Sequence, residues 1–168
     1  MENLSLLQKL AGIIDGKIHE EKEVRLKLKA LPPETKKIKP IHIRQGVLKE
    51  IRDNNGKLIS YARIRERKIP DEPIEYSLGI KNWDEQEKSE AEISKDTFDV
   101  FFPDNVSKVQ DKNRYVLDNG WLIDDMKIPG VITAEFEYKN QDDIPEVPKH
   151  WETDLTVEEA LKHPWERK

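Results

Sequence analysis

The stretch EKEVRLKLK, at residues 21–29, alternates charged and apolar side chains. Residues two apart on a β-strand share a face, so this pattern separates most of the charge from most of the apolar surface. The charged face carries Glu21, Glu23, Arg25, Lys27 and Lys29. The opposite face carries Lys22, Val24, Leu26 and Leu28. The stretch therefore predicts a strand with one polar face and one apolar face.

The same alternation returns in four further predicted strands. Like charges lie two residues apart, opposite apolar neighbours, in Glu90 with Glu92, Glu135 with Glu137, Arg63 with Arg65 and Arg67, and Lys112 with Arg114. Any one of these pairs, taken alone, is typical of a solvated sheet face. If the five strands close into a barrel, the charged faces could instead all point inward and the apolar faces outward, beneath flanking helices.

A barrel interior lined by both signs of charge needs counter-ions, because close like charges removed from water are costly. Six carboxylates suit a hard divalent cation such as Mg²⁺ or Mn²⁺. Arginine and lysine suit a polyphosphate, to which arginine offers paired hydrogen bonds and lysine a point charge. The pattern alone leaves two alternatives open, a charged channel and a set of charged outer surfaces.

Length and composition restrict the class of protein. The 168 residues carry a net charge of −5, from 29 basic and 34 acidic side chains, which argues against general nucleic-acid binding. The chain has no cysteine, which excludes disulfides, thiolate nucleophiles, iron–sulfur centres and cysteine-bound zinc. No apolar run approaches the roughly 20 residues of a membrane-spanning helix, and the N-terminus lacks the pattern of a signal peptide. We therefore expect a cytoplasmic protein with no membrane partner.

Turn signals divide the chain into predicted strands. Asn-Gly sequences predict hairpin turns at Asp53–Gly56 and Asp118–Gly120, since both residue types tolerate the positive φ of a tight turn. Strands are expected at residues 22–29, 47–52, 57–67, 76–81, 88–93, 113–117, 121–126 and 131–139.

Cap signals predict two helices, in addition to an N-terminal helix that is expected at residues 1–17. A short helix is expected at residues 97–102, with Ser94 or Asp96 as its N-cap. Another is expected after Thr156, which forms a capping-box pattern with Glu159.

Together these elements predict a β-dominated α+β fold, an eight-stranded antiparallel closed β-barrel with flanking helices. No repeat or long linker divides the chain. We expect a single domain over residues 1–168. Its parts are an N-terminal helix at residues 1–17, the barrel at residues 18–140, and a C-terminal tail and helix at residues 141–168.

Eight short motifs then give the chain a family resemblance. In order they are EKEVR at 21–25, QGVL at 45–48, RIR at 63–65, IK at 80–81, KSEAE at 88–92, KNRY at 112–115, WLID at 121–124 and AEFE at 134–137. Their order and spacing resemble those of the CYTH superfamily, the triphosphate tunnel metalloenzymes. No single motif is specific, but the eight in sequence are, and they span about residues 18–140.

The resemblance implies an eight-stranded tunnel that binds a triphosphate together with Mg²⁺ or Mn²⁺. It implies a metal-dependent triphosphatase, a phosphoanhydride hydrolase whose substrate is a small molecule: inorganic triphosphate, thiamine triphosphate or a nucleoside triphosphate. An RNA 5′-triphosphate end is a further alternative, and the protein would be a monomer or a homodimer.

The resemblance also assigns the expected site residues. The expected catalytic residues are Glu21, Glu23, Arg25, Glu135 and Glu137. The expected substrate-binding residues are Lys27, Arg63, Arg65, Lys81, Lys112 and Arg114. The expected metal ligands are Glu21, Glu23, Glu90, Glu92, Asp124, Glu135 and Glu137.

Three positions depart from the family pattern. Arg25 stands where lysine is usual, Lys88 where arginine is usual, and Val47 where tyrosine is common. Arginine does not readily lose its proton, so Arg25 cannot act as a base. Three alternatives to the triphosphatase therefore stay open: a class IV-type adenylyl cyclase, a catalytically inactive binder of phosphorylated ligands, and an unrelated β-rich interaction protein.

Overall fold

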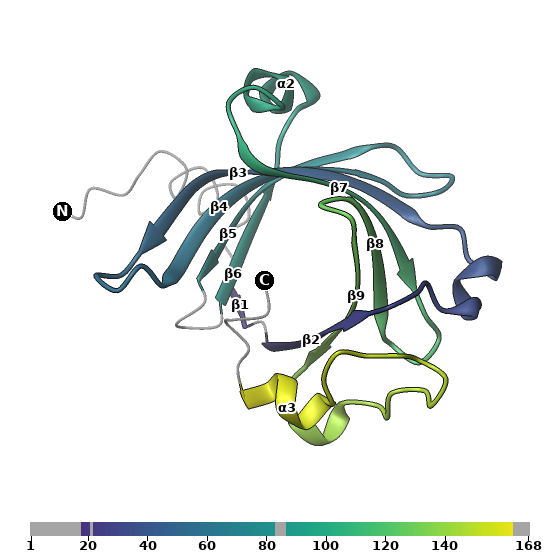
Figure 1. Cartoon of the computed structure of the whole chain (residues 1–168). Coiled ribbons are helices and arrows are strands. Elements are labelled where there is room, and N and C mark those ends of the chain that lie inside the picture. Colours follow the sequence, from purple (N-terminus) through teal and green to yellow (C-terminus); the bar gives the residue numbers. More distant parts are fainter. Residues whose placement is uncertain (1–17, 21, 83–86, 163–168) are drawn as a thin grey trace. The chain divides into compact units, whose positions relative to one another are not determined.

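The computed structural model describes residues 18–20, 22–82 and 87–162, and strands predominate in it (Figure 1). The predicted N-terminal helix and Glu21 lie outside these residues. The described strands are β1 (Ile18–Glu20), β2 (Lys22–Leu28), β3 (Ile41–Arg52), β4 (Leu58–Lys68), β5 (Glu75–Asn82), β6 (Glu87–Glu92), β7 (Ser107–Val116), β8 (Leu122–Ile128) and β9 (Val131–Tyr138). The described helices are two 3-10 helices, η1 (Pro33–Lys37) and η2 (Gln141–Asp143), and two α-helices, α2 (Lys95–Phe101) and α3 (Val157–Lys162). None of these helices has the length and apolar character needed to cross a membrane.

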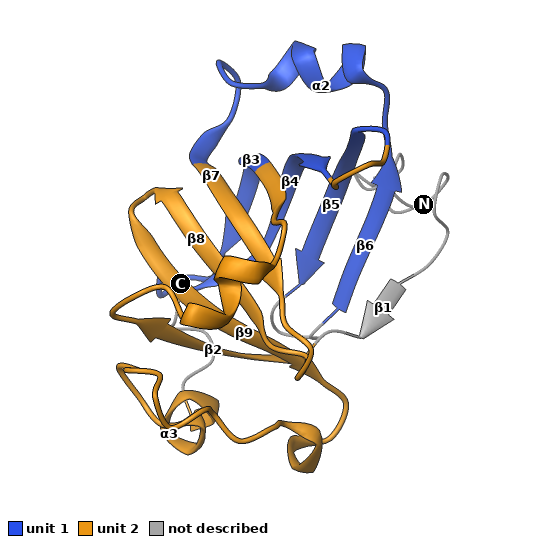
Figure 2. Ribbon diagram, turned by 90° about the vertical axis from the view of Figure 1, so that its right-hand side faces the viewer, with its two compact units in different colours: residues 1–20, 44–68, 73–109 blue, residues 21–43, 69–72, 110–168 orange. Residues whose placement is uncertain are grey.

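The chain forms two compact units, which Figure 2 colours separately. Unit 1 comprises residues 1–20, 44–68 and 73–109, and unit 2 comprises residues 21–43, 69–72 and 110–168. The strand pairs described within each unit are antiparallel. The prediction of a β-dominated, antiparallel α+β fold with few helices is therefore confirmed. Closure of the strands into one barrel stays a prediction.

Unit 1 contains strands β1, β6, β5, β4 and the part of β3 from Arg44 onward, in that order across the sheet. The register sets Ile64 beside Leu78, and Leu78 beside Ala91, so an apolar row crosses three strands on one face. Helix α2 contacts β4 and β5. Its Phe98 is buried and lies against Tyr76, with ring centroids 5.2 Å apart. The helix thus covers the apolar face of this sheet.

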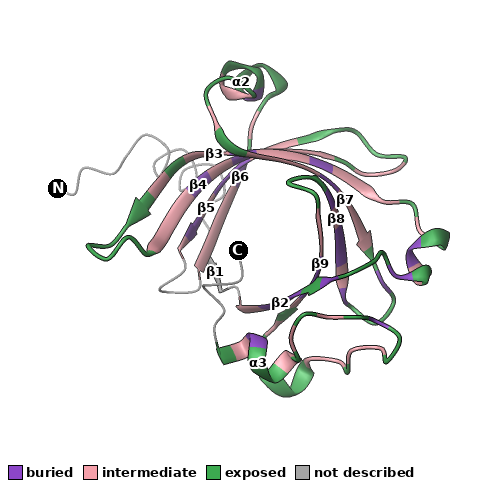
Figure 3. Ribbon diagram, viewed as in Figure 1, coloured by how far each residue is buried: buried purple, intermediate pink, exposed green. Residues whose placement is uncertain are grey.

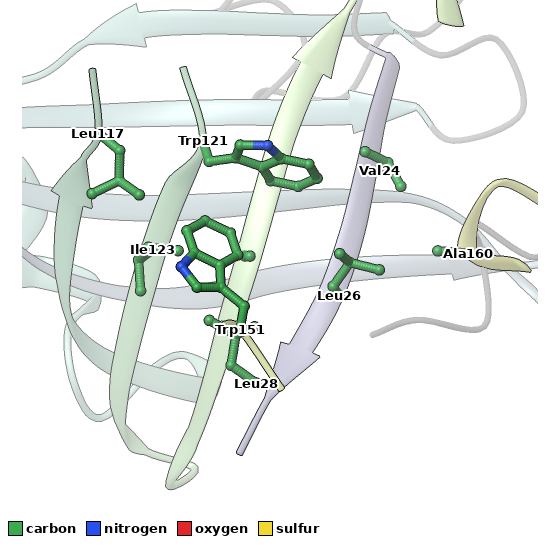
Figure 4. Packing of buried hydrophobic residues seen from close by; sticks show 9 residues of the cluster. Val24, Leu26, Leu28, Leu117, Trp121, Ile123, Trp151 and Ala160 are labelled. Carbon is green, nitrogen blue, oxygen red and sulfur yellow. The ribbon is translucent and has the colours of Figure 1, made fainter. Parts of the chain in front are cut away.

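Unit 2 contains strands β7, β8, β9 and β2, in that order. Its core is a cluster of buried apolar side chains (Figure 4): Val24, Leu26, Leu28, Leu117, Trp121, Ile123, Ala134, Trp151 and Ala160. Trp151 and Ala160 come from the C-terminal tail and α3, so these segments cover the apolar face of the unit 2 sheet. Glu23, Arg25 and Lys27 of β2 alternate with the buried residues and lie on the opposite face.

The turn before Trp121 requires a glycine for two reasons. Gly120 has a φ of +91°, a conformation that residues with a side chain rarely adopt. A Cβ atom placed there would lie 2.7 Å from Cε2 of Phe136. The close approach allows Trp121 to pack tilted against Phe136 and edge-on against Trp151, with centroids 5.6 Å and 6.0 Å apart. The predicted hairpin turn is confirmed and also supports the core.

Both predicted helix caps are confirmed. The Oγ of Ser94, rather than the side chain of Asp96, accepts a hydrogen bond from the backbone N–H of Thr97 at 3.1 Å. The hydroxyl of Thr156 accepts from the N–H of Glu159 at 3.2 Å, and the Glu159 carboxylate accepts from Thr156 in return. These local signals depend on a few neighbouring residues, which is why the sequence predicts them well.

The prediction was wrong for the start of strand β3, which runs unbroken from Ile41 to Arg52, whereas a strand was expected only from Val47. A Cβ atom at Gly46 would lie 2.5 Å from Cγ2 of Val106. This glycine therefore permits a close approach within the strand and does not end it. Strand β7 also begins six residues earlier than expected, at Ser107, and the short β1 was not predicted.

Several charged residues of the sheets are buried, which distinguishes this protein from one whose charges all lie on solvent-exposed outer faces. Figure 3 colours each residue by its burial. Five charged residues of the predicted charged faces are at most 7% exposed: Arg65, Lys81, Lys112, Asp124 and Glu135. Charges on a solvated face would keep their contact with water. Their burial argues against the alternative of a β-rich interaction protein with charged outer faces.

Candidate functional site

The charged face of unit 2 is assembled by the pairing of β2 with β9. In the register, Arg25 lies opposite Glu135 and Glu23 lies opposite Glu137. Directly opposed residues project to the same side of an antiparallel pair, so these four side chains share one face. Lys27, two residues further along β2, lies opposite Thr133 and is exposed.

An ion-pair network joins three of these side chains. Nη2 of Arg25 donates to Oε2 of Glu135 at 2.8 Å and lies 3.4 Å from Oε1 of Glu23. The Glu135 side chain is 5% exposed and that of Glu23 9%, whereas that of Arg25 is 22% exposed. The guanidinium therefore bridges two carboxylates that have little contact with water.

Three carboxylates converge on this face and form what we call the acidic triad: Glu23, Glu135 and Glu137. One oxygen of each lies within 4.8 Å of the others, and within the described part of the chain this is the one group of three ligand-type side chains that meets this distance. Opposite ligands of an octahedral Mg²⁺ lie about 4.2 Å apart, so the triad fits such an ion after a small movement of the side chains. All three donors are carboxylate oxygens, the ligands that Mg²⁺ and Mn²⁺ prefer. The fourth predicted ligand of this strand pair, Glu21, lies outside the described residues.

Asp124 on β8 binds two cations of β7. Nε and Nη2 of Arg114 donate to the two carboxylate oxygens of Asp124 at 2.8 and 2.9 Å, and Nζ of Lys112 donates to Oδ2 at 3.0 Å. Register explains the contact, because Arg114 lies directly opposite Asp124. Both oxygens are thus held by cations, an arrangement that suits a carboxylate that positions Arg114 and Lys112 better than a metal ligand.

Hydrogen bonds and neighbouring charges favour the charged forms of Asp124 and Arg114. Burial alone would raise the pKa of Asp124, but the hydrogen bonds from Arg114 and the charges of Lys112 and Arg114 hold that pKa below its ordinary value. Burial alone would lower the pKa of Arg114, but Asp124 and Glu135 raise it. Nη2 of Arg114 lies 3.9 Å from Oε1 of Glu135. Glu135 therefore stands between two guanidinium groups, Arg25 and Arg114.

The charged face of unit 1 carries the other predicted cations. Arg63 and Arg65 lie on β4 and Lys81 on β5, and Arg65 and Lys81 are buried. Nε of Arg65 donates to Oε1 of Gln45 at 2.9 Å, which fixes the guanidinium. Arg63 lies opposite Gly79 in the register of β4 and β5.

Glu90 on β6 belongs to the same face of unit 1. Its carboxylate accepts from Ser77 at 3.2 Å and lies 3.6 Å from Nζ of Lys88. Burial would raise the pKa of Glu90, but Lys88, Arg63 and Arg65 outweigh it and lower the pKa. Glu92, the second predicted ligand of this strand, is exposed. Within the described residues, neither glutamate joins a group of three ligand-type side chains.

Sequence reasoning missed two polar partners and one buried hydroxyl at these faces. Gln45 and Ser77 hold Arg65 and Glu90, and Thr133, which is buried opposite Asp124, has a hydroxyl without a hydrogen-bond partner among the described residues. The motif QGVL includes Gln45, and alternation along β5 and β9 places Ser77 and Thr133 on the charged faces. Uncharged residues give no charge pattern, however, so only the strand register identifies their contacts.

Two solved structures resemble this chain. A structure described as the hypothetical protein NE1496 aligns with 81% of this chain and 89% of its own, at 21% identity and a TM-score of 0.52. A structure described as the inorganic triphosphatase NE1496 aligns with 80% of this chain and 88% of its own, at 20% identity and a TM-score of 0.51. The chain therefore shares the fold of these two structures.

A fold shared with a structure described as an inorganic triphosphatase agrees with the fold that the resemblance of the eight motifs implied. No model of a known protein family and no curated protein sequence matches this chain. The residues of the CYTH motifs, rather than overall sequence similarity, therefore carry the functional argument.

Proposed function

We propose that this protein is a divalent-metal-dependent hydrolase of triphosphate-containing substrates, with Mg²⁺ or Mn²⁺ as its cofactor. The observation that carries the proposal is the juxtaposition, on one face of unit 2, of the acidic triad and of two cations, the buried Lys112 and the half-buried Arg114. The triad suits a hard cation, and the two basic side chains suit phosphate oxygens. The fold that the chain shares with a structure described as an inorganic triphosphatase is consistent with this assignment.

The acidic and the basic residues would have different roles. Glu23, Glu135 and Glu137 would hold the cation, which when bound supplies Lewis acidity and offsets the charge of the phosphate chain. Arg114, Lys112 and Lys27 would bind phosphoryl oxygens on the unit 2 face. For Arg63, Arg65 and Lys81, which lie in unit 1, substrate binding stays a prediction from the motifs. Asp124 would hold Arg114 and Lys112 in position. Such positioning and charge stabilisation supply most of the catalysis in phosphoryl transfer, because its transition state is loose.

A matched pair of variants tests the assignment. Glu135→Gln keeps the shape of a triad member but removes its charge, and should lower phosphate release from inorganic triphosphate by about 10²–10³-fold, as the loss of one preorganised electrostatic group does elsewhere. Glu152→Gln makes the same change at an exposed residue that pairs only with the exposed Lys29 among the described residues, and should keep the parent rate. Circular dichroism verifies that both variants fold. Equal rates for the two variants would disprove the site.

One observation favours a second candidate, an inactive binder of phosphorylated ligands. Arg25 already forms an ion pair with Glu135, and it stands where the CYTH motif has lysine. Product analysis with inorganic triphosphate, thiamine triphosphate and ATP, each with Mg²⁺ and Mn²⁺, separates the candidates. Released phosphate supports the hydrolase and cyclic AMP from ATP supports the cyclase. Stabilisation by triphosphate without any product supports the binder.

A further inference from the structure

The side chain of Arg25 lies where it interferes with the acidic triad. Its Nη2 contacts one oxygen of Glu135 and one of Glu23, so a single nitrogen joins two of the three triad members. Glu137, the third member, is exposed and forms no ion pair among the described residues. Glu137 is therefore exposed, whereas Glu23 and Glu135 are already paired with Arg25.

Two physical effects make the Arg25 guanidinium compete with a metal ion for the acidic triad. The lone pairs that accept from Nη2 are directed at Arg25 and are less available to another cation. A positive charge about 3 Å from the ligand oxygens also repels an incoming dication. In the absence of metal the same guanidinium is favourable, because three carboxylates so close together would otherwise repel one another with little water to screen them.

We propose that Arg25 is an internal counter-cation, which stabilises the acidic triad of the metal-free protein and competes with the divalent cation for Glu23 and Glu135. The inference rests on the proposed function, since it takes the triad as the metal site. It assigns Arg25 a role that the lysine of the CYTH motif would fill less well, because arginine keeps its charge and can bridge carboxylates with its planar fork. The metal affinity of this chain is accordingly set by how readily Arg25 is displaced.

Direct titration with Mn²⁺ tests the competition without substrate or turnover. The concentration of free Mn²⁺ is followed by electron paramagnetic resonance for the parent, Arg25→Gln and the control Lys27→Gln. The control removes the same charge from the same face of the same strand, at a residue with no ion pair to the triad among those described. Arg25→Gln should bind Mn²⁺ at least about tenfold more tightly than the parent, which corresponds to about 1.4 kcal/mol. Lys27→Gln should change the affinity by less than about threefold.

A thermal measurement provides the second readout. At one Mn²⁺ concentration the melting temperature of Arg25→Gln should rise more than that of the parent, because tighter binding to the folded state stabilises it more. If Arg25→Gln does not fold without metal, Arg25→Lys replaces it, and this variant should bind Mn²⁺ more tightly than the parent because it lacks the fork.

The outcomes separate the two proposals. A parent that binds Mn²⁺ together with Arg25 variants that bind it no more tightly would overturn the competition and leave the metal site intact. An equal gain in Arg25→Gln and Lys27→Gln would also overturn it, since net charge alone would then explain the effect. Failure of the parent and of every variant to bind Mn²⁺ would overturn both the inference and the metal dependence of the proposed function.

Discussion

Asp124 is a fully buried carboxylate that accepts hydrogen bonds from Arg114 and Lys112. Asp124→Asn would remove the carboxylate that two cations with little exposure share. We expect this variant to lower the free energy of unfolding by about 3–5 kcal/mol, the typical cost of removing one partner of a buried pair. Urea denaturation measures the change. Asp125→Asn makes the same substitution at the next residue, which has no ion pair among the described residues, and should change stability by less than about 0.5 kcal/mol.

The same network predicts how stability depends on pH. The pKa of Asp124 is lowered in the folded protein, so the unfolded chain binds this proton more tightly, and stability rises with pH. The stabilisation is complete above the ordinary aspartate pKa of about 3.9 and is lost as the pH falls through the folded pKa. The difference in unfolding free energy between the parent and Asp124→Asn should therefore shrink below about pH 4. Urea denaturation between pH 7 and pH 3 checks this, and a difference that stays constant would contradict it.

At the scale of elements, two hairpin turns offer a matched comparison. Gly56 and Gly120 both have positive φ, but a Cβ at Gly56 would meet no atom within 4 Å, whereas one at Gly120 would meet Phe136 at 2.7 Å. Gly56→Ala should cost about 1 kcal/mol, from backbone strain alone. Gly120→Ala should cost about 1–3 kcal/mol more, because Phe136 must also move against Trp121. Equal melting temperatures for the two variants would show that the contact with Phe136 carries no cost.

How well an element could be predicted depended on the range of the interactions that define it. The alternation of β2, the turn at Gly56 and the cap at Ser94 are encoded within a few residues, and all were predicted. The start of β3 at Ile41 was not, because the role of Gly46 within the strand depends on Val106, which is distant in sequence. A glycine between two strand-like segments suggests a break unless its tertiary neighbour is known.

For the whole molecule, the sequence predicted the two-faced character of the sheets and the residues of their charged faces. It also predicted the three triad glutamates as metal ligands, and the structure brings these together. It did not reveal that Asp124 holds cations, that Arg25 bridges two carboxylates or that Ser77 contacts Glu90. Ion pairing depends on which residues lie opposite one another, and register is fixed by contacts between strands rather than by charge pattern.

The central claim, that the charged faces serve metal-dependent triphosphate hydrolysis, can be measured directly. Phosphate release from inorganic triphosphate is followed for the purified full chain with added Mg²⁺ or Mn²⁺ and with a chelator in place of metal. The account predicts release with at least one of the two metals and a loss of at least about 10²-fold in the chelator. Release that is absent with both metals, or that is unchanged by the chelator, would contradict it.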